Sequence, residues 1–320
     1  MAKQNYYSNH IGDLKRRLVD SVGRDELREL HQVRPLRHFL VLLRHLALAL
    51  GCGVLLWQSD RPWLWIPAGI LQGCNLLGFV ILLHEQVHEC IFRNKRPRLQ
   101  KFLGRLYAFP VGMSATQFKL WHLAHHDELG SHDDDPKRAH LSPKKNSRWV
   151  KFLYATPALF FIYSRASRQE AASYPAETRR VIQLERLVSI IGLLSILGVM
   201  IWLGGVWPAL RVWALPLLIT FPPAFTLNRL GQHYNVDPTN PAKWSSRVDG
   251  NPFWWTVFLW SNFHMEHHYY PRVPFYNLTR LNRKLRPFFN KEEIPNRTYR
   301  EIVWGWIGRN QKAHTNWDQG

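Results

Sequence analysis

The chain has 320 residues, 20% charged and 13% aromatic, and its formal net charge at pH 7 is +19 with histidine neutral. It contains no nucleic-acid recognition motif, so we expect no nucleic acid as a partner. The positive charge is instead expected to attract an anionic membrane face and an acidic partner or an anionic substrate head group. The three cysteines, Cys52, Cys74 and Cys90, exclude a disulfide framework and an iron–sulfur cluster held by this chain alone.

The N-terminal segment, residues 1–36, is charged and helix-like, and it lacks the apolar stretch of a cleaved signal peptide. Two apolar runs follow, at about 38–57 and 63–83. Each is close to the roughly twenty residues that cross a bilayer as a helix. Only QSDRP separates the two runs, so the sequence predicts a tight helical hairpin.

Residues 84–186 form a polar and basic region. Its two apolar pieces, near 102–114 and 150–163, are too short to span a bilayer and are expected to lie at the membrane interface. A second hairpin is predicted from two further apolar runs, at about 187–204 and 209–227. Residues 228–320 are again basic.

Four spans place both polar regions and both termini on one side of the membrane. The two small loops on the other side carry only Arg61 and Arg211, so the basic side is expected to be cytoplasmic. Six tryptophans at the span ends near these loops match an aromatic belt: Trp57, Trp63, Trp65, Trp202, Trp207 and Trp213. We therefore expect one all-α integral-membrane domain over residues 1–320, with four transmembrane helices in two hairpins and a cytoplasmic helical cap.

Three histidine clusters lie in that expected cap. They read HEQVH at 84–88, HLAHH at 122–126 and HMEHH at 264–268. Residues three or four apart share one face of a helix, so each cluster can present two or three imidazoles in one direction. Imidazole is a ligand for iron, copper or zinc, and such repeated clusters are not typical of a solvated surface.

His233 directly follows the fourth apolar run, as His84 follows the second, and we expect it to be a further metal ligand. His132 and His140 are expected beside the site, and His10, His31, His38, His45 and His314 outside it. The ligands then number nine, which suits two metal ions: His84, His88, His122, His125, His126, His233, His264, His267 and His268. Acidic neighbours expected to orient ligand rings are Glu85, Glu89, Asp127, Glu128 and Glu266.

The boxes, their order and the tail HHYYPRVPFYNL resemble the membrane-bound fatty acid desaturase family over roughly residues 38–290. The resemblance implies four spans, a cytoplasmic di-iron site (Fe2+/Fe3+), O2 as oxidant and a separate electron donor. By this resemblance, the eight histidines of the three boxes correspond to the family's metal ligands. His233 corresponds to a further histidine that the family has after the last span. Asn228 is a candidate for an asparagine that some relatives have near that position.

Two features of this sequence differ from those of many members of the family. The first box has three intervening residues where many acyl-CoA desaturases have four, and no haem-binding HPGG of a fused cytochrome b5 occurs. Both features favour a bacterial-type member in the inner membrane, reduced by a soluble donor such as a ferredoxin.

The sequence thus predicts an O2-dependent desaturase acting on a fatty acyl lipid or thioester, with no catalytic residue beyond the metal ligands. A hydroxylase or ketolase acting on a lipid or carotenoid remains an alternative, because the motifs do not distinguish desaturation from hydroxylation or ketone formation. Outside the family, HEQVH also matches a zinc metalloprotease motif with Glu85 as base. A metal transporter is a further alternative, although transport sites usually lie within the spans.

Overall fold

The computed structural model describes residues 5–143, 145–237 and 239–312. Within these ranges the chain is helical and has no β-strand, only an isolated bridge between Arg247 and Asn296. The chain divides into two compact units. The first unit comprises Met1–Val33, Leu120–Phe152 and Leu227–Gly320, and the second comprises Arg34–Lys119 and Leu153–Thr226. A single domain over residues 1–320 stays a prediction.

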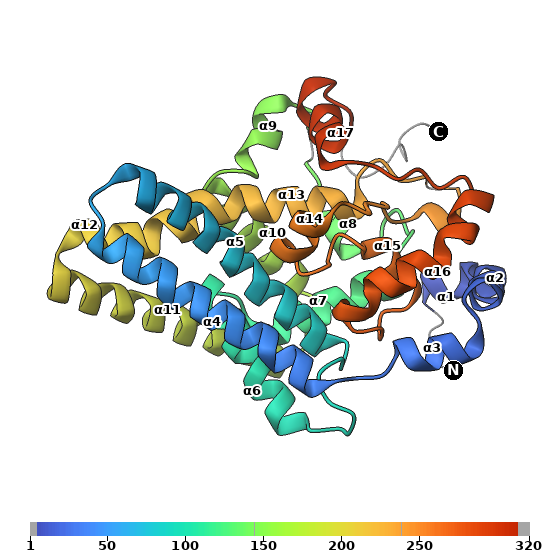
Figure 1. Cartoon of the computed structure of the whole chain (residues 1–320), viewed down its shortest axis with the longest axis horizontal. Helices are drawn as coiled ribbons and strands as arrows, with labels where there is room; N and C mark the ends of the chain where they lie inside the picture. Colours follow the sequence, from blue (N-terminus) through green and yellow to red (C-terminus); the bar gives the residue numbers. More distant parts are fainter. Residues whose placement is uncertain (1–4, 144, 238, 313–320) are drawn as a thin grey trace. The chain divides into compact units, whose positions relative to one another are not determined.

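Four helices are long and apolar enough to cross a membrane (Figure 1). They are α4 (Pro35–Gln58), α5 (Pro62–Val87), α11 (Ala176–Gly204) and a continuous helix, Val206–His233. The last of these consists of α12 (Val206–Ala209), the π-helical η2 (Leu210–Thr220) and α13 (Phe221–His233). The predicted all-α class with four candidate spans is therefore confirmed.

The spanning helices of the second unit pack closely where small residues leave room. A Cβ on Gly78 of α5 would collide with the ring of His45 from α4, and a Cβ on Gly73 would collide with Thr220 of η2. The buried Asn75 also donates from Nδ2 to the backbone carbonyl of His45 over 3.0 Å. Small residues and shared hydrogen bonds are the usual means by which helices associate in lipid, where the hydrophobic effect between helices is absent.

Three of the four helices extend beyond the apolar runs from which they were predicted. Helix α5 continues through His84 to Val87, α11 begins at Ala176, and α13 continues to His233. Hydropathy marks only the lipid-facing part of a helix, whereas backbone hydrogen bonding continues into the polar sequence on either side. Two predicted ligands, His84 and His233, consequently lie in the last turns of long helices.

Arg211 is not a loop residue, contrary to the sequence-based expectation. It lies in η2, where its guanidinium forms a 3.1 Å ion pair with Asp60 and bonds to the backbone carbonyl of Ser59. The side chain is buried, because these partners compensate its charge. The short connections at 59–61 and at Gly205 therefore carry only Arg61 as a cation.

Shorter helices complete the second unit. They are α6 (Pro97–Ala108), the 3-10 turn η1 (Phe109–Val111) and α10 (Ala158–Ala171). The apolar piece expected near 102–114 is thus divided, because the chain turns at Gly112 in a left-handed conformation with φ +67°. Three helices, α7 (Ala115–Asp127), α9 (Arg148–Leu153) and α13, have residues in both units.

The first unit is built from short helices, of which α2 and α16 lie side by side (Figure 1). Arg17 of α2 pairs with Glu292 just after α16, and Lys284 of α16 pairs with Glu26 of α3 over 3.1 Å. Its helices are α1 (Tyr6–His10), α2 (Gly12–Val22), α3 (Arg24–Leu30), α8 (Pro136–Leu141), α14 (Pro252–Val257), α15 (His264–Tyr269), α16 (Leu278–Lys291) and α17 (Tyr299–Val303). Its shorter turns are η3 (Pro241–Lys243), η4 (Phe275–Asn277) and η5 (Trp304–Gly308).

Candidate metal centre

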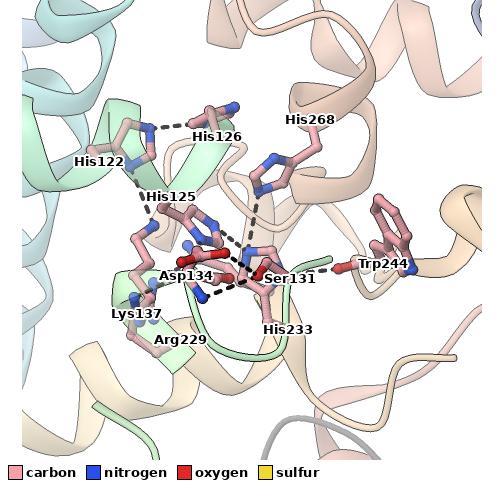
Figure 2. Close-up of polar contacts among 12 residues, drawn as sticks. His122, His125, His126, Ser131, Asp134, Lys137, Arg229, His233, Trp244 and His268 are labelled. Carbon is pink, nitrogen blue, oxygen red and sulfur yellow. Dashed lines mark hydrogen bonds and ion pairs between the residues drawn. The ribbon is translucent and has the colours of Figure 1, made fainter. Parts of the chain in front are cut away.

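Three helices bring seven of the nine predicted ligands together within the first unit. Helix α7 carries the second box, α15 carries the third, and α13 ends at His233. In both boxes the histidines are spaced at i, i+3 and i+4, so the helical repeat turns their rings to one side. Figure 2 shows the rings of His125, His233 and His268 directed toward one another.

Four buried imidazoles form the first group: His125, His233, His264 and His268. The Nε2 atom of His233 lies 3.0 Å from that of His125, 3.0 Å from that of His264 and 3.1 Å from that of His268. The Nε2 atoms of His264 and His268 are 3.0 Å apart. Ring nitrogens this close cannot all donate to one another, so the arrangement is that of a ligand set around a shared point.

The spacing of these nitrogens also carries information about coordination. With a metal–imidazole bond of roughly 2.1 Å, ligands at right angles have nitrogens about 3.0 Å apart, and tetrahedral ligands have nitrogens about 3.4 Å apart. The separations of 3.0–3.1 Å fit right angles. The spacing is therefore compatible with four imidazoles around one metal ion.

A second group of imidazoles lies beside the first. The Nε2 atom of His126 is 3.0 Å from that of His122 and 3.1 Å from that of His267. The two groups adjoin, because the ring centroids of His126 and His268 are 4.3 Å apart. One unit of the chain therefore offers donors for two neighbouring metal ions, and the residues fit such ions in number and in chemistry.

The first box lies in the other unit, at the end of α5. The rings of His84 and His88 are 4.9 Å apart, and His88 is buried. Glu85 Oε1 lies 3.8 Å from His84 Nδ1, and Glu89 follows in a left-handed conformation with φ +60°. A ligand role for His84 and His88 stays a prediction.

Two groups that sequence reasoning missed orient the ligand rings. Asp135 Oδ1 accepts from His125 Nδ1 over 2.8 Å, and the carbonyl of Trp244 accepts from His233 Nδ1 over 3.2 Å. A hydrogen bond at Nδ1 fixes the tautomer that leaves Nε2 free for a metal. Asp135 also caps the N-terminus of α8 by accepting a hydrogen bond from Lys137 N. An aspartate directly before a proline is a recognisable pattern for the start of a helix, so the sequence did contain a signal for the position of Asp135. No sequence pattern identifies a backbone carbonyl.

Three predicted neighbours of the ligands bond elsewhere. Asp127 accepts from Asn5 over 2.8 Å, and Glu266 accepts from Asn282 over 2.6 Å. Asn228 donates to Ser261 over 2.6 Å and accepts from Gln232. Among the described residues, none of these three side chains hydrogen-bonds to a ligand ring.

The remaining histidines are distributed as follows. His132 is exposed and pairs with Asp133 over 2.6 Å, and His140 lies in α8. His10 and His31 bond to backbone carbonyls in their own helical turns, whereas His38 and His45 are buried in α4. His314 lies outside the described residues.

Burial disfavours the protonated form of at least one imidazole of the centre. Burial, followed by the neighbouring histidines and Lys137, lowers the pKa of His264 well below its usual value. Lys137 Nζ lies 3.2 Å from His122 Nδ1, and burial together with Arg229 lowers the pKa of this lysine against the opposing effect of Asp135. Neutral imidazole is the form that binds metals, so the surroundings suit ligation.

Comparison with known proteins gives consistent results. The model of the fatty acid desaturase family matches residues 60–300, a range that includes all three boxes and His233. An sn-1 oleoyl-lipid 12-desaturase from Picosynechococcus sp. is 24% identical, over 78% of this chain and 77% of its own. A sphingolipid Δ4-desaturase/C4-monooxygenase from Homo sapiens is 25% identical, over 84% and 78%. A β-carotene ketolase from Paracoccus sp. is 26% identical, over 63% and 72%.

Proposed function

This chain belongs to the fatty acid desaturase family, and from that premise we propose that it uses two iron ions and O2 to introduce a double bond into a fatty acyl chain. It is a membrane protein and an oxidoreductase of that family. The observation that carries the proposal is the pair of adjoining imidazole groups, which together offer nitrogen donors for two neighbouring metal ions.

We propose that His84 and His88 complete the second imidazole group. The first unit alone supplies four donors to the first group but three to the second, namely His122, His126 and His267. Two further imidazoles would raise the second set to five, and HEQVH supplies them at the end of α5. The nine histidines would then hold two ions.

The metal ions and the protein would contribute differently to the proposed reaction. When bound, the irons supply the activation of O2, which is not available to amino-acid side chains alone. Desaturation removes two hydrogens from neighbouring carbons and, with two electrons and two protons from outside, converts O2 to two molecules of water. The chain's contribution is to hold neutral imidazoles, to orient them through Asp135 and Trp244, and to exclude water by burial.

We propose two hairpins of spans, with the histidine boxes on the cytoplasmic side of a bacterial inner membrane. Arg61 as the sole cation of the short connections supports this orientation. The exposed rings of Trp63 and Trp202 near those connections, 68% and 82% accessible, support an interface there.

An acyl chain is the substrate that we favour, carried as a lipid or thioester. Two of the compared relatives are lipid desaturases by name, and the tail after the third box resembles acyl desaturases. The likeness to a β-carotene ketolase keeps a hydroxylase or ketolase as the second candidate. The zinc-protease alternative has no support, because the family match accounts for HEQVH together with both HxxHH boxes.

We further propose that a separate acidic protein, such as a ferredoxin, delivers the electrons. The formal charge of +19 supports steering of an acidic partner toward this chain.

The experiment that tests the reaction feeds deuterated fatty acids to cells expressing the chain under 18O2. Loss of two deuterium atoms without 18O in the lipid is the expected result. Retention of 18O in the main product, or turnover of carotenoids only, would contradict the desaturase proposal.

A further inference from the structure

The N-terminal strap, defined here as Asn5–His10, contacts segments of the first unit that carry or adjoin the candidate metal ligands. It consists of α1 and its N-cap, Asn5, whose side chain accepts from Ser8 N. An isolated helix of this length is not stable in water, so its order depends on the contacts that it makes. We propose that the strap is a positioning element for the metal ligands and that it and the metal stabilise each other. The inference rests on the proposed metal centre.

The strap bonds to the segments that carry both HxxHH boxes. Asn5 Nδ2 donates to Asp127 Oδ1 over 2.8 Å, and the Tyr6 amide donates to Glu128 Oε2 over 3.4 Å. These two acceptors directly follow His126 at the end of the second box. One end of the strap is therefore bonded to the last residue of α7 and to the residue that follows it.

Tyr7 bonds to the third box itself. Its hydroxyl donates to the backbone carbonyl of His268 over 3.3 Å. This carbonyl lies at the C-terminal end of α15, where carbonyl groups have no partner within the helix. The hydrogen bond therefore restrains the last turn of a six-residue helix that carries His267 and His268.

Trp244 connects the strap to His233. Its buried ring packs against three rings of the strap, with centroid distances of 5.8 Å to Tyr6, 6.1 Å to Tyr7 and 5.8 Å to His10. Its carbonyl accepts from His233 Nδ1 (Figure 2). The position of the Trp244 ring thus determines where that carbonyl lies and, through it, how the His233 ring is turned.

The same tryptophan also packs against the chain beyond the second box. Gly130 has φ +93°, and a Cβ at this position would collide with the ring of Trp244. The ring of Trp244 therefore contacts both Gly130 and the strap, and these contacts restrain its position.

A reciprocal effect follows from these contacts. If the strap stabilises the ligand geometry that binds metal, metal binding must stabilise the strap by the same factor. This linkage separates a positioning role from a merely structural contact, which the metal would not alter.

The test measures backbone hydrogen exchange in the purified full-length protein, free of metal and loaded anaerobically with Fe2+ alone. We expect Fe2+ to slow exchange in the strap by roughly threefold to tenfold, the factor that one net hydrogen bond corresponds to. Tyr7→Phe should reduce this protection and should speed iron loss to a chelator by a similar factor. Trp244→Phe, which keeps an aromatic ring, should have a smaller effect in the same direction.

Tyr6→Phe is the matched control, because the Tyr6 hydroxyl makes no hydrogen bond with any residue that the structure describes. It should behave as the unaltered protein in both measurements. Strap exchange that does not respond to Fe2+, or equal iron loss from the Tyr7→Phe and Tyr6→Phe proteins, would overturn the proposal. Neither readout requires turnover, so failure of this inference is distinguishable from failure of the proposed reaction, which the 18O2 experiment reports.

Discussion

Two of the proposed ligands, His125 and His233, are oriented through a hydrogen bond at the ring nitrogen that does not face the other imidazoles. The nitrogen spacings that define the first group are meaningful only if the rings cannot rotate, and Asp135 restrains the ring of His125 through a buried 2.8 Å hydrogen bond. Partners of this kind are the part of a metal site most easily overlooked, because they need not lie near the ligands in sequence.

Asp135→Asn should weaken metal binding without unfolding the protein. The amide still accepts a hydrogen bond, but it lacks the negative charge that makes the imidazole a stronger ligand, so we expect a roughly tenfold to hundredfold loss in metal affinity. Competition with a graded series of chelators measures this. Asp133→Asn is the control, because Asp133 is exposed and pairs with the exposed His132. Equal affinities for the two variants would contradict the role of Asp135.

The sequence predicted the gathered histidines for a physical reason. Spacing at i, i+3 and i+4 places side chains on one face of any helix, so the members of a box can be predicted without knowledge of the fold. The carbonyl of Trp244 could not be predicted, since every residue has a carbonyl and only the fold decides which one faces His233.

Single helices are also positioned by contacts distant in sequence. Glu185 of α11 accepts from Ser114 Oγ over 2.7 Å, from Thr116 N over 3.0 Å and from Arg105 Nε over 2.9 Å. A carboxylate at the start of α7 satisfies backbone amides that lack partners and complements the positive end of the helix. This places a restraint at the beginning of the helix that carries the second box.

Glu185→Gln should therefore loosen the first turn of α7. Loss of the charged acceptor should cost about 1–3 kcal/mol of stability and should speed hydrogen exchange near Thr116. Thermal unfolding in detergent and exchange measurements report the two effects. Glu177→Gln, at an exposed position in the same helix, is the control and should leave exchange near Thr116 unchanged. Unaltered exchange at Thr116 in the Glu185→Gln protein would show that the restraint is unimportant.

The elements themselves were predictable in their centres but not at their ends. Apolar runs predicted all four spans, because a bilayer requires about twenty apolar residues. Hydropathy could not reveal that α5 reaches Val87, or that Arg211 is buried beside Asp60. The first follows from backbone hydrogen bonding that continues past the apolar run, and the second from polar partners that only the folded chain supplies.

For the whole molecule, the distribution of charge sets the proposed orientation in the membrane. A cysteine introduced by Ser59→Cys should react with a membrane-impermeant reagent added outside intact cells, because the connection at 59–61 is proposed to be external. A cysteine introduced by Asp20→Cys, at an exposed position of α2, should react only after permeabilisation. The reverse pattern of labelling would show that the protein has the opposite orientation in the membrane.

The metal content of the purified protein tests the central claim most directly. The two adjoining imidazole groups, with nitrogens 3.0–3.1 Å apart, predict two metal ions in each chain. Elemental analysis of protein purified from iron-replete cells, together with Mössbauer spectroscopy, should find close to two irons in each chain. One zinc and no iron in each chain would contradict the account.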